Sequence, residues 1–278
     1  MSIGMRVMIW ADVEGVAGIN AWEQTGGKSP LYEDGRRLYT EEVNAAVRGC
    51  KTAGASEIIV VDGHGGGYEG ARGFMTLIPE RLESGAQYVL GHPWARYVEP
   101  FERGCDAVVF VGAHAKAGTA DGVLSHTVSS ESWYLATING TPVGESGIIA
   151  AIAGSWNVPA VFVAGDEATC LEVQQLLGSA VVTVPVKKGL GRYSALHVAP
   201  VDARARIEAG VAKALKGKDG WPQPLRFDAP VTFQVELATP DRATAFMGRT
   251  RVEIVGPRTV RASGQNFWEA WDAIWYRN

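Results

Sequence analysis

The chain has 278 residues, of which 46% are hydrophobic, so it is long and apolar enough to bury a substantial core. Its net charge of −4 provides no basic face, so we expect neither nucleic acid nor an anionic membrane surface as a partner. Its three cysteines, Cys50, Cys105 and Cys170, are widely spaced, which argues against a disulfide framework.

The first predicted strand covers residues 6–11 and begins almost at the start of the sequence. Nothing before it resembles a secretory signal, so we expect a cytoplasmic protein. A glycine-rich loop over residues 18–29 leads to Ser29-Pro30, a helix start signal, and Gly54 ends this helix. A strand over 57–61 then completes a βαβ unit, whose crossover makes the two strands parallel.

The same alternation continues to about residue 190. We expect a weak helix over 69–82, strands over 87–90 and 106–112, and a hairpin-like strand over 133–138 with an Asn139-Gly140 turn. Further on, we expect a helix over 144–156, a strand over 159–164, a helix capped by Asp166, and a strand over 181–186. The sequence therefore predicts an α/β fold with a mostly parallel open sheet flanked by helices.

The pattern changes after about residue 200. An amphipathic helix over 201–216 is followed by a proline-rich stretch, two or three alternating strands between residues 231 and 261, and a Trp-rich helix over 266–276. We therefore expect two domains, an α/β catalytic metal-binding domain over 1–200 and a smaller α+β domain over 201–278. Lys187 follows the last strand of the first series without an identifiable partner.

Four apolar runs of the first part end near residues that can bind a metal. Asp12 and Glu14 follow the run over 6–11, His64 and His114 follow the next two, and Glu145 comes shortly after residues 134–138. If these runs are parallel strands of one sheet, their carboxyl ends meet at one edge, where open α/β sheets bind ligands. The leading hypothesis from the residues is therefore a metal-dependent hydrolase.

Glu145 and the histidines also have simpler interpretations. Glu145 precedes a predicted helix and could serve only as a favourable acid at its positive end. A histidine at a strand end is more often hydrogen-bonded than metal-bound when it stands alone. His126, flanked by Ser125 and Thr127, could lie behind the ligands or act as an acid or base beside them. Asp62 is expected to orient His64.

A rival pattern lies in the same turn. Gly65, Gly67 and Gly70 have the spacing of a dinucleotide-binding fingerprint after a strand. The next predicted strand, however, ends in Leu90-Gly91-His92, with no acid for a ribose hydroxyl. A non-catalytic nucleotide or small-molecule binding module therefore stays an alternative of another class.

Taken together, the motifs resemble the D-aminopeptidase family of bacterial peptidases over most of the chain up to about residue 190. They are Asp12-Val13-Glu14-Gly15, Asp62-Gly63-His64, Gly112-Ala113-His114-Ala115, Ser125-His126, Val143-Gly144-Glu145 and Val163-Ala164-Gly165-Asp166, together with Tyr32-Glu33, Gly35-Arg36, Thr40-Glu41-Glu42 and Asn44. Two departures are one extra residue between His114 and His126, and the glycines around His64 where the family has more polar residues. Both bear on substrate preference more than on metal binding.

The resemblance implies a binuclear zinc peptidase that removes N-terminal D-amino acids, typically D-alanine, from short peptides by means of metal-activated water. It implies two Zn²⁺ per chain, His126 as the catalytic residue, and a ring-shaped homo-oligomer. The implied zinc ligands are Asp12, Glu14, His64, His114 and Glu145. A metal-dependent L-aminopeptidase or small-amide hydrolase is the alternative that keeps the same metal site.

Overall fold

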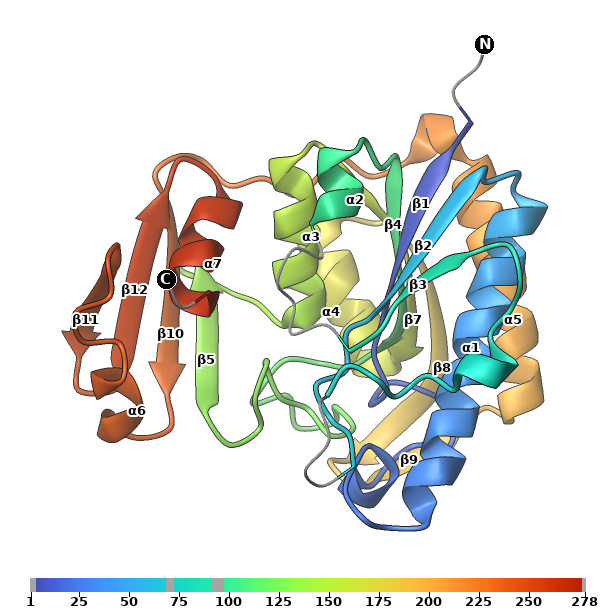
Figure 1. Ribbon diagram of the computed structural model, residues 1–278, viewed down its shortest axis with the longest axis horizontal. Coiled ribbons are helices and arrows are strands. Elements are labelled where there is room, and N and C mark those ends of the chain that lie inside the picture. The colour runs from blue at the N-terminus through green and yellow to red at the C-terminus, as the bar shows by residue number, and fades with distance from the viewer. Residues whose placement is uncertain (1–3, 69–72, 92–97, 277–278) are drawn as a thin grey trace.

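The computed structural model describes residues 4–68, 73–91 and 98–276 and contains two β-sheets (Figure 1). Sheet A has seven strands in the order β3-β2-β1-β4-β7-β8-β9, and sheet B has five in the order β11-β12-β10-β5-β6. In this described part of the chain, no helix combines the length and apolar character that crossing a bilayer requires.

Sheet A is parallel except for its last strand, β9, which runs antiparallel to β8. The central strand β1 lies between β2 and β4. From β1, the next strands along the chain are added on one side (β2, β3) and the later ones on the other (β4, β7, β8), as in other open α/β sheets. The strands are β1 (Arg6–Ala11), β2 (Glu57–Asp62), β3 (Gln87–Val89), β4 (Ala107–Ala113), β7 (Ala160–Asp166), β8 (Val182–Gly191) and β9 (Ser194–His197). The predicted mostly parallel sheet is thus confirmed.

Helices cover both faces of sheet A because successive strand residues point to opposite sides. In β1, Val7 and Ile9 pack with the face that carries α1 and α5, whereas Met8 and Trp10 pack with the face that carries α3. Gly49 lets α1 and α5 approach closely, since a Cβ there would lie 2.6 Å from the carbonyl oxygen of Glu208. The helices that flank sheet A are α1 (Leu31–Thr52), α2 (Glu99–Glu102), α3 (Glu145–Ser155), α4 (Glu167–Leu177) and α5 (Pro200–Lys216).

Sheet B is antiparallel and takes strands from distant parts of the sequence. The hairpin of β5 (Trp133–Ile138) and β6 (Thr141–Pro142) pairs with β10, and β10 pairs with β12. The prediction that residues 134–138 form a buried parallel strand was wrong, because β5 pairs antiparallel with both of its neighbours and its Tyr134 and Leu135 are 64% and 36% exposed. The predicted hairpin with its turn at Asn139-Gly140 is confirmed. The remaining elements on this side are β10 (Val231–Leu237), β11 (Val252–Gly256), β12 (Thr259–Gly264), α6 (Pro240–Thr244) and α7 (Phe267–Trp275).

The weak helix predicted over 69–82 is not formed in its described part. Residues 73–78 are irregular, and only Pro79–Arg81 make a single 3₁₀ turn; residues 69–72 lie outside the described part.

The predicted cap at Asp166 is confirmed, because Asp166 Oδ1 accepts a hydrogen bond of 2.7 Å from the Thr169 amide at the start of α4. One hydrophobic core contains residues of α3, which precedes residue 200, and of β10 and α7, which follow it. The division into two domains near residue 200 stays a prediction.

Candidate metal centre

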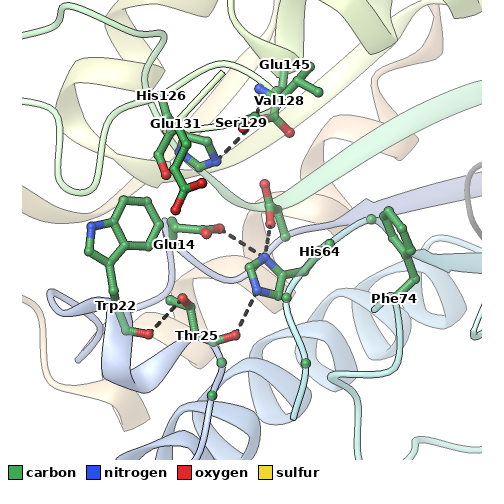
Figure 2. Close-up of a pocket in the computed structure, with 18 of the residues that line it drawn as sticks. Glu14, Trp22, Thr25, His64, Phe74, His126, Val128, Ser129, Glu131 and Glu145 are labelled. Carbon is green, nitrogen blue, oxygen red and sulfur yellow. Dashed lines mark hydrogen bonds and ion pairs between the residues drawn. The ribbon is translucent and has the colours of Figure 1, made fainter. Parts of the chain in front are cut away.

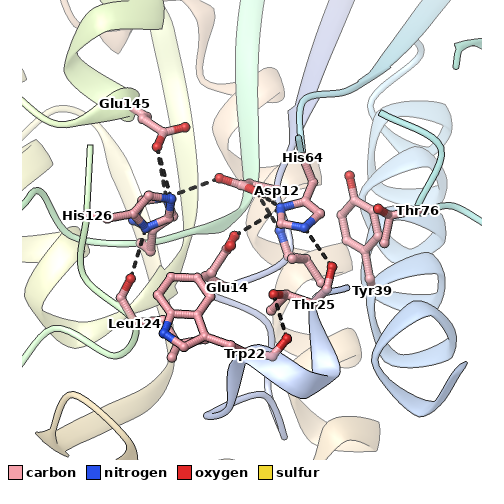
Figure 3. A network of polar contacts seen from close by, with 12 residues as sticks. Asp12, Glu14, Trp22, Thr25, Tyr39, His64, Thr76, Leu124, His126 and Glu145 are labelled. Atoms are coloured by element: carbon pink, nitrogen blue, oxygen red, sulfur yellow. Dashed lines mark hydrogen bonds and ion pairs between the residues drawn. The ribbon is translucent and has the colours of Figure 1, made fainter. Parts of the chain in front are cut away.

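Three neighbouring strands deliver candidate ligands to the same edge of sheet A. Asp12 and Glu14 follow β1, His64 follows β2, and His114 follows β4. Because β2 and β4 lie on either side of β1, residues more than 100 positions apart in the sequence become neighbours (Figure 3). This edge is the crevice in which open α/β sheets bind ligands.

Asp12 lies between the two histidines and contacts both. Its Oδ1 is 3.2 Å from Nδ1 of His64, and its Oδ2 is 3.3 Å from Nε2 of His114. Glu14 Oε2 lies 3.3 Å from the same nitrogen of His64, and Glu145 Oε1 lies 3.3 Å from the same nitrogen of His114. All five side chains are buried.

The structure thus forms two groups of potential ligands. Asp12, Glu14 and His64 make the first cluster, and His114, His126 and Glu145 make the second. Within each cluster the ligand atoms lie within 4.8 Å of one another. Asp12 also reaches the second cluster through His114, so a single carboxylate joins the two.

Backbone carbonyls fix the orientation of both rings. His64 Nε2 lies 2.8 Å from the Thr25 carbonyl oxygen, and His114 Nδ1 lies 3.1 Å from that of Ala115. When each of these nitrogens donates its proton to the carbonyl, the other ring nitrogen is left to face the carboxylates. Gly66 is required here, because a Cβ at this position would lie 2.2 Å from His64 Nε2.

Asp62 does not orient the His64 ring, contrary to the prediction. Its oxygens accept hydrogen bonds from the Tyr39 hydroxyl at 3.0 Å, from the Thr76 amide at 2.7 Å, and from the amide of His64 itself at 3.3 Å. It therefore holds the backbone after β2. The group that orients the His64 ring is the Thr25 carbonyl, 39 residues earlier in the sequence. No local sequence pattern indicates this contact.

The electrostatics of the centre favour a bound cation. Burial alone would raise the pKa of Asp12, but His114 and His64 hold it well below its ordinary value. Burial would conversely lower the pKa of His64, but Glu14 and Asp12 raise it well above the ordinary value. Three buried carboxylates converge here, and such a concentration of negative charge needs compensation by protons or metal ions.

Two buried ligand atoms support a metal rather than hydrogen bonding alone. In the described part of the chain, neither Glu14 Oε2 nor His114 Nε2 has a hydrogen-bond partner, although both face the shared centre. Buried polar atoms seldom stay unsatisfied. Carboxylate oxygens and imidazole nitrogens are the ligands that zinc takes in proteins, so the residues present fit this ion.

His126, the third member of the second cluster, lies on the loop between β4 and β5. Its ring stacks on that of His114, with centroids 4.1 Å apart and planes 5° apart. Nδ1 is 2.9 Å from the Leu124 carbonyl oxygen, so the ring can present Nε2, which lies 3.6 Å from Glu145 Oε1. Trp22 packs against the His126 ring in an edge-on arrangement, with the two ring centroids 5.4 Å apart.

The position of Glu145 is consistent with both interpretations that the sequence offered. It is the first residue of α3, and its Oε1 faces His114. The same oxygen accepts a hydrogen bond of 2.7 Å from the Val128 amide. The carboxylate therefore ties the loop that carries His126 to the second cluster.

An open cleft of about 470 Å³ gives access to the centre (Figure 2). It is lined by five residues of the two clusters and by four further side chains, namely Asp12, Glu14, His64, His126 and Glu145 together with Trp22, Phe74, Glu131 and Trp275. Such a volume is typical of small-molecule sites, which span about 300–1,000 Å³. The sequence did not indicate Trp22, Thr25 or Trp275, because nothing local shows that they border this cleft.

The glycine-rich turn after β2 forms part of the cleft wall. Gly65 and Gly67 lie there, and the Gly27 amide donates a 2.9 Å hydrogen bond to the Gly67 carbonyl. The fingerprint of a dinucleotide site requires a helix directly after such a turn, but residues 73–78 are not helical. Gly70 and His92 lie outside the described residues.

Comparisons with known proteins show which family the chain is similar to. A model of the D-aminopeptidase family matches residues 5–276. A D-aminopeptidase of Bacillus subtilis (strain 168) is 30% identical over 282 residues, which cover 97% of this chain and 95% of that protein. The solved structure of DppA, described as a Zn-dependent D-aminopeptidase and self-compartmentalizing protease from Bacillus subtilis, is similar with a TM-score of 0.85 at 28% identity, covering 96% of this chain and 95% of that one.

Proposed function

Because the chain belongs to the D-aminopeptidase family, we propose that it is a zinc peptidase that removes N-terminal D-amino acids, of the D-alanine type, from short peptides. The observation that carries this proposal is Asp12, which faces a histidine of each cluster with a different carboxylate oxygen. A carboxylate in that position can bridge two metal ions.

We assign one zinc ion to each cluster, hence two per chain. Asp12, Glu14 and His64 would hold the first, and Asp12, His114 and Glu145 would hold the second. Bound zinc supplies Lewis acidity, which polarises a peptide carbonyl and brings the pKa of water down to about 7. His126 stays outside both ligand sets in this assignment.

His126 is the proposed catalytic residue. Its Nδ1–H donates a hydrogen bond to the Leu124 carbonyl oxygen, so the Nε2 lone pair can accept a proton from the attacking water and deliver it to the leaving amine. Stacking on His114 and the contact with Trp22 hold the ring in one orientation at the edge of the cleft. As an imidazolium, the same ring would stabilise negative charge on the carbonyl oxygen under attack.

The cleft also carries features suited to a short peptide. Trp22 and Phe74 supply apolar walls for a small side chain, and Glu131 supplies a carboxylate that can pair with the free ammonium of a peptide N-terminus (Figure 2). Trp275 adds a third apolar wall. Recognition of that ammonium would distinguish an aminopeptidase from an endopeptidase. Trp275 comes from α7, so the C-terminal part contributes to substrate binding.

We further propose that the chain assembles into a ring-shaped homo-oligomer. DppA is described as self-compartmentalizing, and this chain has exposed apolar side chains on and next to the β8–β9 hairpin, namely Leu190, Leu196 and Val201. Exposed apolar side chains are candidates for a protein contact surface where they lie together. A cytoplasmic location stays a prediction from the sequence.

The function is tested by removing metal with a chelator and measuring release of D-alanine from D-Ala-D-Ala. We expect activity to disappear and to return when about two zinc ions per chain are added back. The same assay with L-Ala-L-Ala separates the two stereochemical alternatives, and we expect much slower hydrolysis. Activity that survives complete removal of metal, or a preference for the L-peptide, would contradict the proposal.

A further inference from the structure

A buried lysine lies directly behind the first cluster. Lys187 in β8 is 2% exposed, and its Nζ donates hydrogen bonds to three backbone carbonyls of the loop after β1. The distances are 2.5 Å to the oxygen of Glu14, 2.9 Å to that of Val16 and 2.6 Å to that of Ile19. No sequence pattern indicates these partners, which lie about 170 residues away.

The three contacts match the chemistry of a protonated amine. A lysine ammonium has three N–H donors and no acceptor, and here three carbonyl oxygens converge on it. In the described part of the chain, its hydrogen bonds go to backbone carbonyls and none goes to a carboxylate. The ammonium is thus used to shape the loop.

The other polar groups of this loop are tied to different partners. The Ala17 amide donates to Glu42 Oε1 at 2.9 Å, the Gly18 amide to His197 Nδ1 at 3.0 Å, and the Gly15 amide to the Gly112 carbonyl at 2.8 Å. These partners accept hydrogen bonds from the amides of the loop, whereas Lys187 donates hydrogen bonds to the carbonyls of Glu14, Val16 and Ile19. Without the ammonium, the carbonyl oxygens of Glu14 and Ile19 would lose this donor, and that of Val16 would keep only the Ile19 amide at 3.2 Å, which is costly enough to reshape the loop.

Glu14 belongs to this loop and also to the first cluster. Its carbonyl points to Lys187 while its carboxylate points to Nδ1 of His64. We propose that Lys187 is a positioning residue that fixes Glu14 for zinc binding in the first cluster and leaves the second cluster largely unaffected. The proposal rests on the proposed zinc peptidase function.

The second cluster has separate supports. Its histidine is held by the Ala115 carbonyl, and Glu145 is held by the Val128 amide. The His114 carbonyl in turn accepts a hydrogen bond of 2.8 Å from Thr169 Oγ1. Because none of these contacts involves Lys187, its loss should weaken one metal position selectively.

The test compares Lys187→Met with Lys188→Met, which removes the same charge one residue further along the strand. Lys188 is 56% exposed in its side chain and pairs with Glu167 at 3.2 Å, away from the loop. The measurement is zinc bound per chain at a series of fixed free zinc concentrations. We expect wild type and K188M to bind two, and K187M to bind its more weakly held zinc about 10–100-fold less tightly, as for other residues that support ligands.

A second pair of variants identifies which position is lost. At a free zinc concentration where K187M binds one ion, adding His64→Ala should leave that ion in place, and adding His114→Ala should remove it. If K187M does not fold, Lys187→Gln, which keeps two donors, should show a smaller loss of the same ion. Failure of both variants to fold would assign Lys187 to the stability of the whole domain and overturn the proposal.

The remaining outcomes are equally distinct. A wild-type protein with two zinc ions and a K187M variant with the same two affinities would overturn this inference alone. Equal weakening of both positions would also overturn it, because the effect would then not act through Glu14. A wild-type protein that binds no zinc would overturn the proposed function, and the inference with it.

Discussion

The first and second clusters share one carboxylate but are built from different kinds of structure. The first cluster lies at the ends of two adjacent strands, β1 and β2, on a loop fixed from behind by Lys187. The second combines the end of β4, the first residue of α3 and a long loop that leads to sheet B. The first cluster is therefore an extension of the sheet, whereas the second connects the metal centre to the C-terminal part.

This difference suggests a division of labour. The strand-borne cluster supplies only proposed zinc ligands, and the second cluster also carries His126. Near the second cluster, the cleft is completed by Glu131 from the same loop and by Trp275 from α7. Changes on the two sides should accordingly have different effects on metal binding, turnover and substrate affinity.

The largest effect is expected for Asp12→Asn, because Asp12 belongs to both sides. Loss of one charge should weaken both proposed zinc positions together and lower kcat/KM by more than about 10³-fold, since in the proposed mechanism the metal ions would supply most of the catalysis. Zinc analysis and D-Ala-D-Ala hydrolysis measure both effects. Asp121→Asn, at an exposed position, is the matched control. An Asp12 variant with one zinc fully retained would show that the carboxylate serves only one cluster.

His126→Gln should separate catalysis from metal binding. We expect kcat to fall by about 10²–10⁴-fold, the usual contribution of an acid–base residue, while two zinc ions remain bound. Steady-state kinetics combined with zinc analysis gives the answer. Loss of one zinc ion would instead make His126 a ligand of the second cluster, which its distance of 3.6 Å from Glu145 would permit.

Trp275→Ala tests whether the C-terminal part shapes the substrate site. The indole borders the cleft without belonging to either cluster, so we expect KM for D-Ala-D-Ala to rise about tenfold with little change in kcat. Trp275→Phe, which keeps an aromatic wall, should stay close to wild type. An unchanged KM in the alanine variant would remove α7 from the description of the binding site.

The last prediction concerns stability, and not activity, on the side of the first cluster. Burial raises the pKa of Glu42 to about 7 from its ordinary value of 4.5. Above pH 4.5 the unfolded chain loses this proton before the folded protein does, so the free energy of unfolding should decrease as the pH rises towards 7. Glu42→Gln removes this dependence and should gain about 2 kcal/mol relative to wild type between about pH 5 and pH 7.5.

Urea unfolding of both proteins at several pH values measures this difference. In the Glu42→Gln variant, the side-chain amide oxygen can still accept the hydrogen bond from Ala17, which keeps the loop contact comparable. A stability difference that does not vary with pH would contradict the raised pKa.

The sequence predicted the strand-borne side of the centre because its signals are local. Apolar runs that end in Asp12, His64 and His114 indicate both a parallel strand and its carboxyl end, and the topology then brings them together. Strand bounds for β1, β2 and β4 agree with the prediction to within one residue.

The other side depended on contacts that are not encoded locally. Residues 134–138 have the apolar character of a buried strand, but their pairing with β10, almost 100 residues later, decides that they belong to sheet B. The partners of Lys187 and the carbonyl that orients His64 likewise come from distant loops. The hydrophobic pattern of a sequence indicates which residues are apolar enough to be buried. It does not indicate which distant residues they contact in the folded chain.

Anomalous diffraction at the zinc edge from crystals of the zinc-loaded protein is the most direct test of the central claim. The account predicts two peaks per chain about 3.5–4 Å apart, each about 2.0–2.2 Å from its ligand atoms. Asp12 should bind both ions, one together with Glu14 and His64 and the other together with His114 and Glu145. A single peak, or peaks without Asp12 between them, would contradict it.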